Sequence, residues 1–153
     1  MNKVLALHSK FQKWPFGKTL FSYLVARMAP YFLTIKPQVI DIKKNYIKVS
    51  MRKRPAVYNH LKTVHAIASC NLCEFAAGVL MEASIPNHRR WIPVGMQVSY
   101  LKKAKTDLTA ICDFGNPDWD TIDKQICEVS VKDKNDVEVV KAFIEMKVSD
   151  KKT

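Results

Sequence analysis

The sequence predicts an α+β fold in which one strongly curved antiparallel sheet wraps around a single long helix. Residues 65–83 form a helical pattern with apolar or small side chains on nearly every side. Such a helix must be buried over most of its surface. Two strand-like segments precede it and four follow it. Because one curved antiparallel sheet can surround most of such a helix, the helix is expected on one face of the sheet.

The strands are predicted from alternating apolar and polar residues. Residues 38–53 contain two strands around a polar turn at 43–45, and residues 54–64 form a loop before the long helix. After Pro86 the chain is strand-like to its end. The predicted strands there span residues 94–100, 108–114, 125–131 and 137–148, the last two as a closing antiparallel pair.

A shorter helix is predicted over residues 17–29, where Leu20, Leu24 and Met28 lie at helical spacing and Pro30 ends the pattern. Aromatic residues are dense around it: Trp14, Phe16, Phe21, Tyr23, Tyr31 and Phe32. Three interpretations remain open. The helix packs over an edge of the core, forms a lid over a ligand pocket, or makes a weak contact with a membrane surface.

A length of 153 residues predicts a single domain. We expect a helical N-terminal extension at residues 1–35, a core at 36–148 and a polar, basic tail at 149–153. No segment reaches the ~18 apolar residues of a membrane span. His8, Lys10 and Lys13 interrupt any early apolar run, which argues against a signal peptide. A cytoplasmic protein without integral membrane association is therefore expected.

The four cysteines lack the dense spacing of a disulfide scaffold. Cys70 and Cys73 form a C-x-x-C inside the apolar helix, with no second ligand pair at zinc spacing. Reduced, mostly buried thiols are the expectation, with no metal site and no separate cofactor.

The formal net charge of +11 favours anionic partners. The basic residues gather in two clusters, Lys43, Lys44, Lys48, Arg52, Lys53 and Arg54, then Arg89, Arg90, Lys102, Lys103 and Lys105. They form either a solvated surface or a functional patch. No helix-turn-helix, zinc or aromatic RNA-binding motif accompanies them, so no nucleic acid is expected as a partner.

Glu74 is the first candidate for chemistry, because it is the only charged residue between His65 and Met81. Burying a carboxylate in apolar surroundings is costly unless it is paired. The alternative is that Glu74 lies on a stripe that reaches solvent or a subunit interface.

The start of the long helix is the second candidate. His65, Ala66 and Ile67 stand there, and unpaired N–H groups of a first helical turn can hold an oxyanion. His65 and Glu74 are nine residues apart, so on one helix they lie about 13 Å apart and face opposite sides. A site that uses both must draw on two subunits.

The segment from Asn59 to Ala66, continuing into residues 71–76, resembles hotdog-fold acyl-CoA thioesterases of the phenylacetate-pathway and 4-hydroxybenzoyl-CoA types. It resembles still more a bacterial, largely uncharacterised branch with an extra N-terminal helix. In those families an Asn or Gln stands six residues before the His of an H-G-G helix start, and an Asp or Glu stands nine residues after it. Asn59, His65 and Glu74 match both spacings, and residues 97–104 resemble a later family strand.

The resemblance implies a hotdog fold, a homodimer or dimer of dimers, and hydrolysis of an acyl-CoA, with coenzyme A as part of the substrate. The Ala66 amide would bind the thioester carbonyl, assisted by Asn59. Glu74 of the neighbouring subunit would act as base or nucleophile. The alternative is a non-catalytic acyl-CoA-binding protein.

Two departures affect the expected pocket. Ala66 and Ile67 replace the glycine pair, so the Ile67 side chain would narrow the carbonyl site. Gly78 stands where some members carry a hydroxyl, and would leave space for the acyl group. The expected contacts with the CoA phosphates are basic residues that flank the helix end and the following strand: Arg89, Arg90, Lys102 and Lys103.

Overall fold

The structure is a computed structural model that describes residues 2–151. Its helices are α1 (Lys3–Phe11), α2 (Gly17–Met28) and α3 (Ala66–Ser84), with short 3-10 helices η1 (Pro30–Thr34) and η2 (Pro55–Val57). The strands are β1 (Gln38–Lys43), β2 (Tyr46–Met51), β3 (Arg89–Tyr100), β4 (Leu108–Asp113), β5 (Lys124–Lys132) and β6 (Glu138–Asp150).

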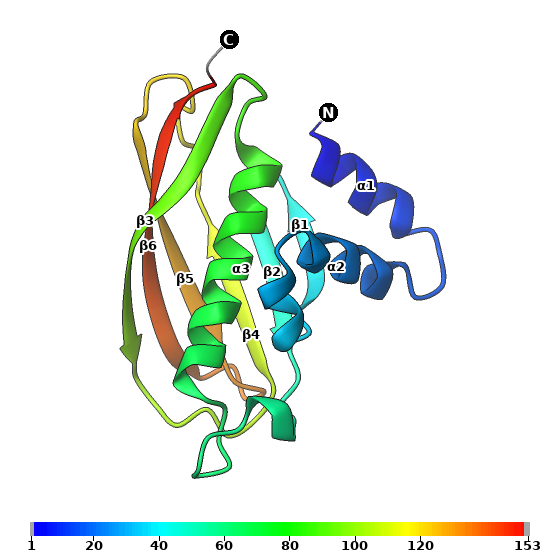
Figure 1. Cartoon of the computed structure of the whole chain (residues 1–153), viewed down its shortest axis with the longest axis vertical. Coiled ribbons are helices and arrows are strands. Elements are labelled where there is room, and N and C mark those ends of the chain that lie inside the picture. Colours follow the sequence, from blue (N-terminus) through cyan, green and yellow to red (C-terminus); the bar gives the residue numbers. More distant parts are fainter. Residues whose placement is uncertain (1, 152–153) are drawn as a thin grey trace.

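All six strands form one antiparallel sheet in the order β1-β2-β4-β5-β6-β3. The sheet curves around α3, as Figure 1 shows. The buried residues of α3, among them Leu72, Phe75 and Leu80, pack against the inward-facing residues of the central strands. The predicted α+β fold, with a curved antiparallel sheet wrapped around a long helix, is confirmed.

α3 begins where the sequence predicts. His65 is its N-cap, and the ring Nδ1 accepts a hydrogen bond of 3.1 Å from the backbone N–H of Ile67. Contrary to the expectation that no segment is long and apolar enough for a membrane span, α3 reaches that limit by length and composition, but most of it is buried inside this protein. It is the core helix of the fold.

The ends of the sheet differ from the prediction. β3 starts at Arg89 rather than at residue 94, and so includes Pro93. An edge strand tolerates a proline at a bulge, and the β3–β6 register shifts between Pro93 and Gly95. β6 continues to Asp150 because Ser149 and Asp150 pair with the start of β3. The tail predicted to begin at residue 149 is therefore wrong for these two residues, and residues 152–153 lie outside the described part.

The N-terminal extension covers the β1 side of the core. Phe21 and Ala26 of α2 are fully buried, and the Ser22 hydroxyl accepts a 2.8 Å hydrogen bond from the Val39 N–H of β1. Phe32 packs edge-on against Phe75 of α3, with ring centroids 5.3 Å apart. Of the three interpretations of residues 17–29, packing over a core edge is confirmed for this face of the helix.

Within the helical extension expected at residues 1–35, the sequence analysis located only the helix at 17–29, and α1 is an additional helix. Its start is marked by Asn2, whose side chain accepts a hydrogen bond from the Val4 N–H. His8 attaches α1 to α2 by burying its ring edge-on against Phe21, with ring centroids 4.9 Å apart. Burial lowers the pKa of His8 below its ordinary 6.5, which the Asp41 carboxylate opposes and Lys18 reinforces.

The protein should therefore lose stability on mild acidification. An unfolded His8 binds a proton more readily than the folded one, so the stabilisation is complete above pH 6.5 and declines as the pH falls towards the lowered folded pKa. Thermal unfolding between pH 7.5 and 5.5 should show a smaller decline in His8→Leu than in the wild type. His60→Gln, at an exposed histidine, should keep the wild-type decline. An equal pH dependence in His8→Leu would contradict this assignment.

Candidate active site

One side of α3, which the sheet covers only in part, carries a line of residues four positions apart. Cys70, Glu74, Gly78 and Glu82 make up this line, which we call the α3 stripe. Glu74 is exposed on the protomer, and no hydrogen bond or ion pair to its side chain occurs within residues 2–151. Glu74 thus lies on a stripe that reaches the protomer surface, the alternative that the sequence left open.

Strand β3 contacts the α3 stripe at two places. At one end of β3 the Tyr100 hydroxyl lies 3.0 Å from the Cys70 Sγ, a hydrogen bond that raises the pKa of Tyr100 to about 12. At the other end the Trp91 Nε1 donates a 3.1 Å hydrogen bond to Glu82. Glu74 lies between these two contacts along the helix.

β3 is an edge strand, so one side of its backbone has no neighbour within the sheet. Its exposed apolar side chains are Ile92, Val94, Met96 and Tyr100. A long edge with exposed apolar side chains is a template for pairing with another strand. The carboxylate of Glu74 therefore lies on a surface suited to cover by a second protomer.

The start of α3 carries a free amide. No hydrogen bond from the Ala66 N–H occurs in the described part of the chain, whereas the Ile67 N–H is bound to His65. A pocket of about 200 Å³ lies beside this first turn. His65, Ile67, Ala68 and Asn71 line it from α3, and Tyr31, Thr34 and Ile35 line it from the N-terminal extension.

The N-terminal extension also forms part of the pocket wall. Besides packing on the core edge, the extension closes one wall of the space beside the helix start, and Thr34 Oγ1 accepts a 3.3 Å hydrogen bond from the Asn71 side chain. Residues 31–35 directly follow the segment that the sequence analysis considered as a lid. Their place in the pocket wall was not predicted, because it depends on where η1 packs, and no local sequence pattern specifies that.

Glu74 does not reach the Ala66 amide of its own helix. Eight residues along an α-helix correspond to a rise of about 12 Å. His65 and Ile67 line the pocket, Ala66 stands between them in the chain, and Glu74 lies on the α3 stripe farther along the helix. One protomer therefore holds the two halves of the predicted site apart.

Asn59 organises its own loop. Its Oδ1 accepts hydrogen bonds from the backbone N–H groups of Leu61 and Thr63, and its Nδ2 donates to the Thr63 Oγ1 at 2.9 Å. This arrangement leaves one Nδ2 hydrogen for a substrate. Asn59 does not line the pocket beside Ala66.

The space beside Gly78, which was expected to receive the acyl group, is occupied by the Trp91 side chain. A Cβ at this position would lie 3.2 Å from the Trp91 ring. The indole therefore occupies the space that the glycine leaves, and it does so from β3 of the same protomer. Trp91 and Glu82 were missed in the sequence, although continuing the four-residue spacing from Glu74 through Gly78 would have reached Glu82.

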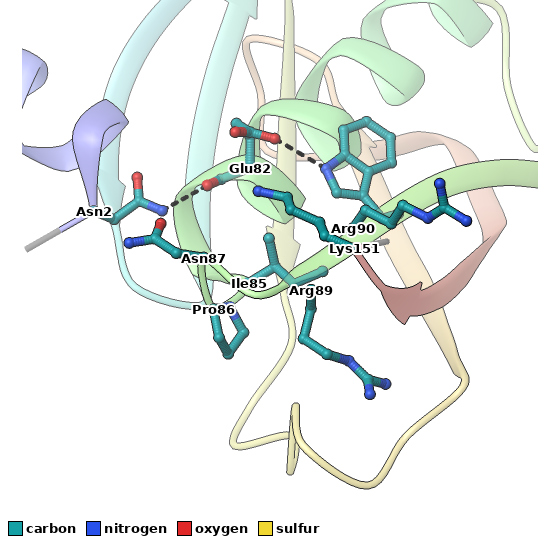
Figure 2. Close-up of a pocket in the computed structure, with 9 residues that line it drawn as sticks. Asn2, Glu82, Ile85, Pro86, Asn87, Arg89, Arg90 and Lys151 are labelled. Carbon is teal, nitrogen blue, oxygen red and sulfur yellow. Dashed lines mark hydrogen bonds between the residues drawn. The ribbon is translucent and has the colours of Figure 1, made fainter. Parts of the chain in front are cut away.

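The four basic residues expected to bind phosphate occupy the two ends of β3. Figure 2 shows Arg89 and Arg90 at a pocket of about 260 Å³ by the end of α3, where Lys151 also lies. Lys102 and Lys103 are exposed just past the other end of the strand. The strand between them has 12 residues, so the two pairs lie roughly 40 Å apart.

Arg89 is committed to its own chain. Its guanidinium forms a 2.9 Å ion pair with Asp150 and also bonds the Ile122 carbonyl, and its side chain is nearly buried. Arg90 is exposed and donates to the Ser149 hydroxyl at 3.1 Å. Of the two arginines expected to contact phosphate, Arg89 is thus already engaged by the end of β6 and by the loop before β5, whereas Arg90 is exposed.

All four cysteines are free thiols. Burial raises the pKa of Cys73 and of Cys127 to about 12, and also raises that of Cys112. Such thiols stay protonated and unreactive at neutral pH. Cys70 and Cys73 belong to different environments, one half-exposed on the α3 stripe and the other buried in the core.

Solved structures share this fold at high coverage. Genomics target APC5556 is 39% identical in sequence, with a TM-score of 0.85 over 97% of this chain and 98% of that one. PA5026 from Pseudomonas aeruginosa, a protein of unknown function described as a probable thioesterase, is 16% identical, with a TM-score of 0.75 over 90% and 97%. The protein smu.793 from Streptococcus mutans, solved bound to acetyl CoA, is 18% identical, with a TM-score of 0.63 over 75% and 90%.

The fold is the hotdog fold of thioesterase-family proteins, as the resemblance implied. No functionally curated protein is detectably similar in sequence. Residues 17–148 match a family described as Domain of unknown function (DUF4442). The match begins at the first residue of α2 and ends within β6, so it covers α3, strands β1 to β5 and all but the last two residues of β6. The chain belongs to the DUF4442 family.

Proposed function

We propose that the protein is a thioesterase that hydrolyses an acyl-CoA at a site shared by two protomers. The observation that carries the proposal is that one protomer holds its two reactive groups apart. Within residues 2–151 the Ala66 N–H at the start of α3 and the Glu74 carboxylate on the α3 stripe, beside the β3 edge, have no hydrogen-bond partner. Structural neighbours described as thioesterases, and one solved bound to acetyl CoA, support it.

A dimer through β3 would complete the site. Two copies of an edge strand pair antiparallel around a two-fold axis, which turns each copy of α3 end for end relative to the other. The helix start of one protomer then moves towards the stripe of its neighbour. This dimer is our proposal for the basic assembly, and a dimer of dimers would add a second contact through another face.

The same pairing would gather the basic residues. With β3 antiparallel to its copy, the Arg90 end of one strand lies beside the Lys102 and Lys103 end of the other. These three side chains are exposed, and CoA carries several phosphate charges for Lys and Arg to neutralise. Within one protomer they are too far apart to serve one ligand.

The proposed reaction uses groups that this chain supplies. The Ala66 N–H, at the positive end of the α3 dipole, donates to the thioester carbonyl oxygen and stabilises the oxyanion that forms. Glu74 of the partner subunit accepts a proton from water as the water oxygen attacks the carbonyl carbon. The carbon–sulfur bond then breaks, and the proton passes to the departing CoA thiolate. Direct attack by the carboxylate, followed by hydrolysis of the anhydride, gives the same products.

The test is turnover of an acyl-CoA panel, from acetyl to long-chain and aromatic acyl groups, measured by release of the free thiol. We expect hydrolysis of at least one member. Binding of the same panel is measured separately by calorimetry. Failure to hydrolyse or bind any acyl-CoA would contradict the proposed substrate class, and a carrier-protein thioester would be tested next.

A non-catalytic acyl-CoA-binding protein is the second candidate. It is favoured by Ile67, whose N–H is occupied by His65 and whose side chain lines the pocket in place of a glycine. The Ile67 amide is then unavailable to the carbonyl. Binding without release of thiol across the whole panel would select this candidate. Both candidates would act in the cytoplasm, where the four free thiols stay reduced, and neither involves nucleic acid.

A further inference from the structure

Helix α2 has two apolar faces, and the protomer covers only one of them. Phe21, Ser22 and Ala26 are buried against the core. On the opposite face Leu20, Tyr23, Leu24 and Met28 are exposed. At 100° per residue these four side chains fall within about 140° of the helix circumference. A helix that is apolar on its outer face as well needs a second apolar environment.

The turn between α1 and α2 extends this exposed face. Phe16 precedes Leu20 by four residues and is 87% exposed, and Met28 at the far end of the helix is 83% exposed. Trp14, in the same turn, is also exposed. Figure 1 shows α1, α2 and their connecting turn projecting from the β1 side of the sheet. We call Trp14, Phe16, Leu20, Tyr23, Leu24, Met28 and Tyr31 the N-terminal apolar face.

Phe16 is held in an unfavourable backbone conformation. Its φ is 60°, in the left-handed region, where bulky residues are uncommon and which favours Gly or Asn. The Phe16 side chain makes little contact with the rest of the protomer, although its backbone adopts this strained conformation. Strain of this kind persists at functional sites, where it positions a side chain for a contact.

The charge around this face has one sign. Residues 1–40 contain no Asp or Glu, and their basic residues are Lys3, Lys10, Lys13, Lys18, Arg27 and Lys36. In the described part of the chain none of these six side chains belongs to an ion pair. Lys13 and Lys18 flank the exposed turn directly, and Arg27 lies within the exposed face of α2.

We propose that the N-terminal apolar face docks on the surface of an anionic lipid bilayer, with Trp14 and Phe16 at the depth of the headgroups. Exposed aromatic and aliphatic side chains surrounded by Lys and Arg are the composition that binds such an interface. Charge argues against a second copy of the chain on the same face, because each copy would bring its own unpaired basic residues and no carboxylate from residues 1–40. This proposal is independent of thioester hydrolysis.

The test is co-sedimentation of the full-length protein with vesicles of phosphatidylcholine alone or with 30 mol% phosphatidylglycerol. We expect binding to the anionic vesicles, little binding to the neutral ones, and a marked decrease when salt rises from 0.05 to 0.5 M, since surface charges are then screened. Lys13→Glu with Lys18→Glu should weaken binding by at least tenfold. Lys105→Glu with Lys134→Glu changes the net charge equally at exposed positions elsewhere and should weaken it far less.

The apolar contact is tested separately. Phe16→Asn with Met28→Gln should weaken binding to anionic vesicles by at least tenfold, while Leu61→Gln, at an exposed residue of another loop, should leave it unchanged. Because Asn accepts the left-handed conformation, Phe16→Asn alone should raise the unfolding temperature by about 2–4 °C. Loss of binding in a more stable protein cannot come from misfolding.

Tryptophan emission locates the contact. Anionic vesicles should shift the emission of the wild type to shorter wavelength, and the shift should be absent in Trp14→Phe. The proposal is overturned if anionic vesicles do not bind the protein, if the Phe16 and Lys13 variant pairs bind as well as their controls, or if the shift persists in Trp14→Phe. It is equally overturned if the Phe16→Asn, Met28→Gln pair only dissociates a self-associated form of the protein.

Discussion

Glu74→Gln is expected to reduce acyl-CoA hydrolysis by about 10²-fold or more, the scale of a positioned general base. The amide keeps the size and the hydrogen-bonding capacity of the carboxylate but cannot accept the proton from water or attack the thioester. Folding should be unaffected, because Glu74 is exposed on the protomer and no partner of its side chain occurs within residues 2–151. Acyl-CoA binding should survive, since a neutral amide is less costly to desolvate than a carboxylate.

Glu82→Gln is the matched control. Glu82 lies on the same α3 stripe two turns later and is also exposed, and its bond to the Trp91 indole can be accepted equally by a Gln oxygen. Its hydrolysis rate should stay within about twofold of the wild type. An enzyme that hydrolyses acyl-CoA equally well with Gln at position 74 would end the catalytic role proposed for Glu74, whereas equal losses in both variants would indicate a general effect of charge on the stripe.

The layout of the fold was predictable because local patterns dictate it. The alternation in residues 46–51 specifies a strand with one buried face, and the apolar surface of residues 66–84 requires a sheet around it. At β3 the alternation correctly predicted residues 94–100 but missed residues 89–93, where Pro93 interrupts the pattern. The alternation also did not reveal that Val94 and Met96 are exposed on an edge strand.

The site was predictable only in part. His65 and Glu74 could be located because their chemistry follows from position on one helix. The contacts of Arg89 and Gly78 could not, since Asp150 and Trp91, respectively, reach them through pairing of β3 with β6 and packing of β3 on α3. The contacts of Asn59 could not be predicted either, for another reason. Its side chain bonds within its own loop, a competition between local and substrate hydrogen bonds that the sequence spacing alone does not reveal.

Met96→Lys is expected to separate the protein into monomers and to remove hydrolysis together with the dimer. Met96 lies within two residues of the middle of β3, and its side chain is 39% exposed on the protomer. A two-fold axis through the strand would bring the two introduced lysines close together, and like charges on adjacent paired strands repel. The dimer dissociation constant should rise by at least tenfold, as measured by sedimentation equilibrium.

Hydrolysis should follow the fraction of dimer, because one protomer holds Ala66 and Glu74 about 12 Å apart along α3. Activity per chain in Met96→Lys should therefore increase with protein concentration, while that of the wild type stays constant above its own dissociation constant. Leu61→Lys adds the same charge at an exposed loop residue outside β3 and should remain a fully active dimer. A monomeric Met96→Lys variant with wild-type turnover would show that one protomer contains the whole site, and the shared arrangement of Ala66 and Glu74 would then be wrong.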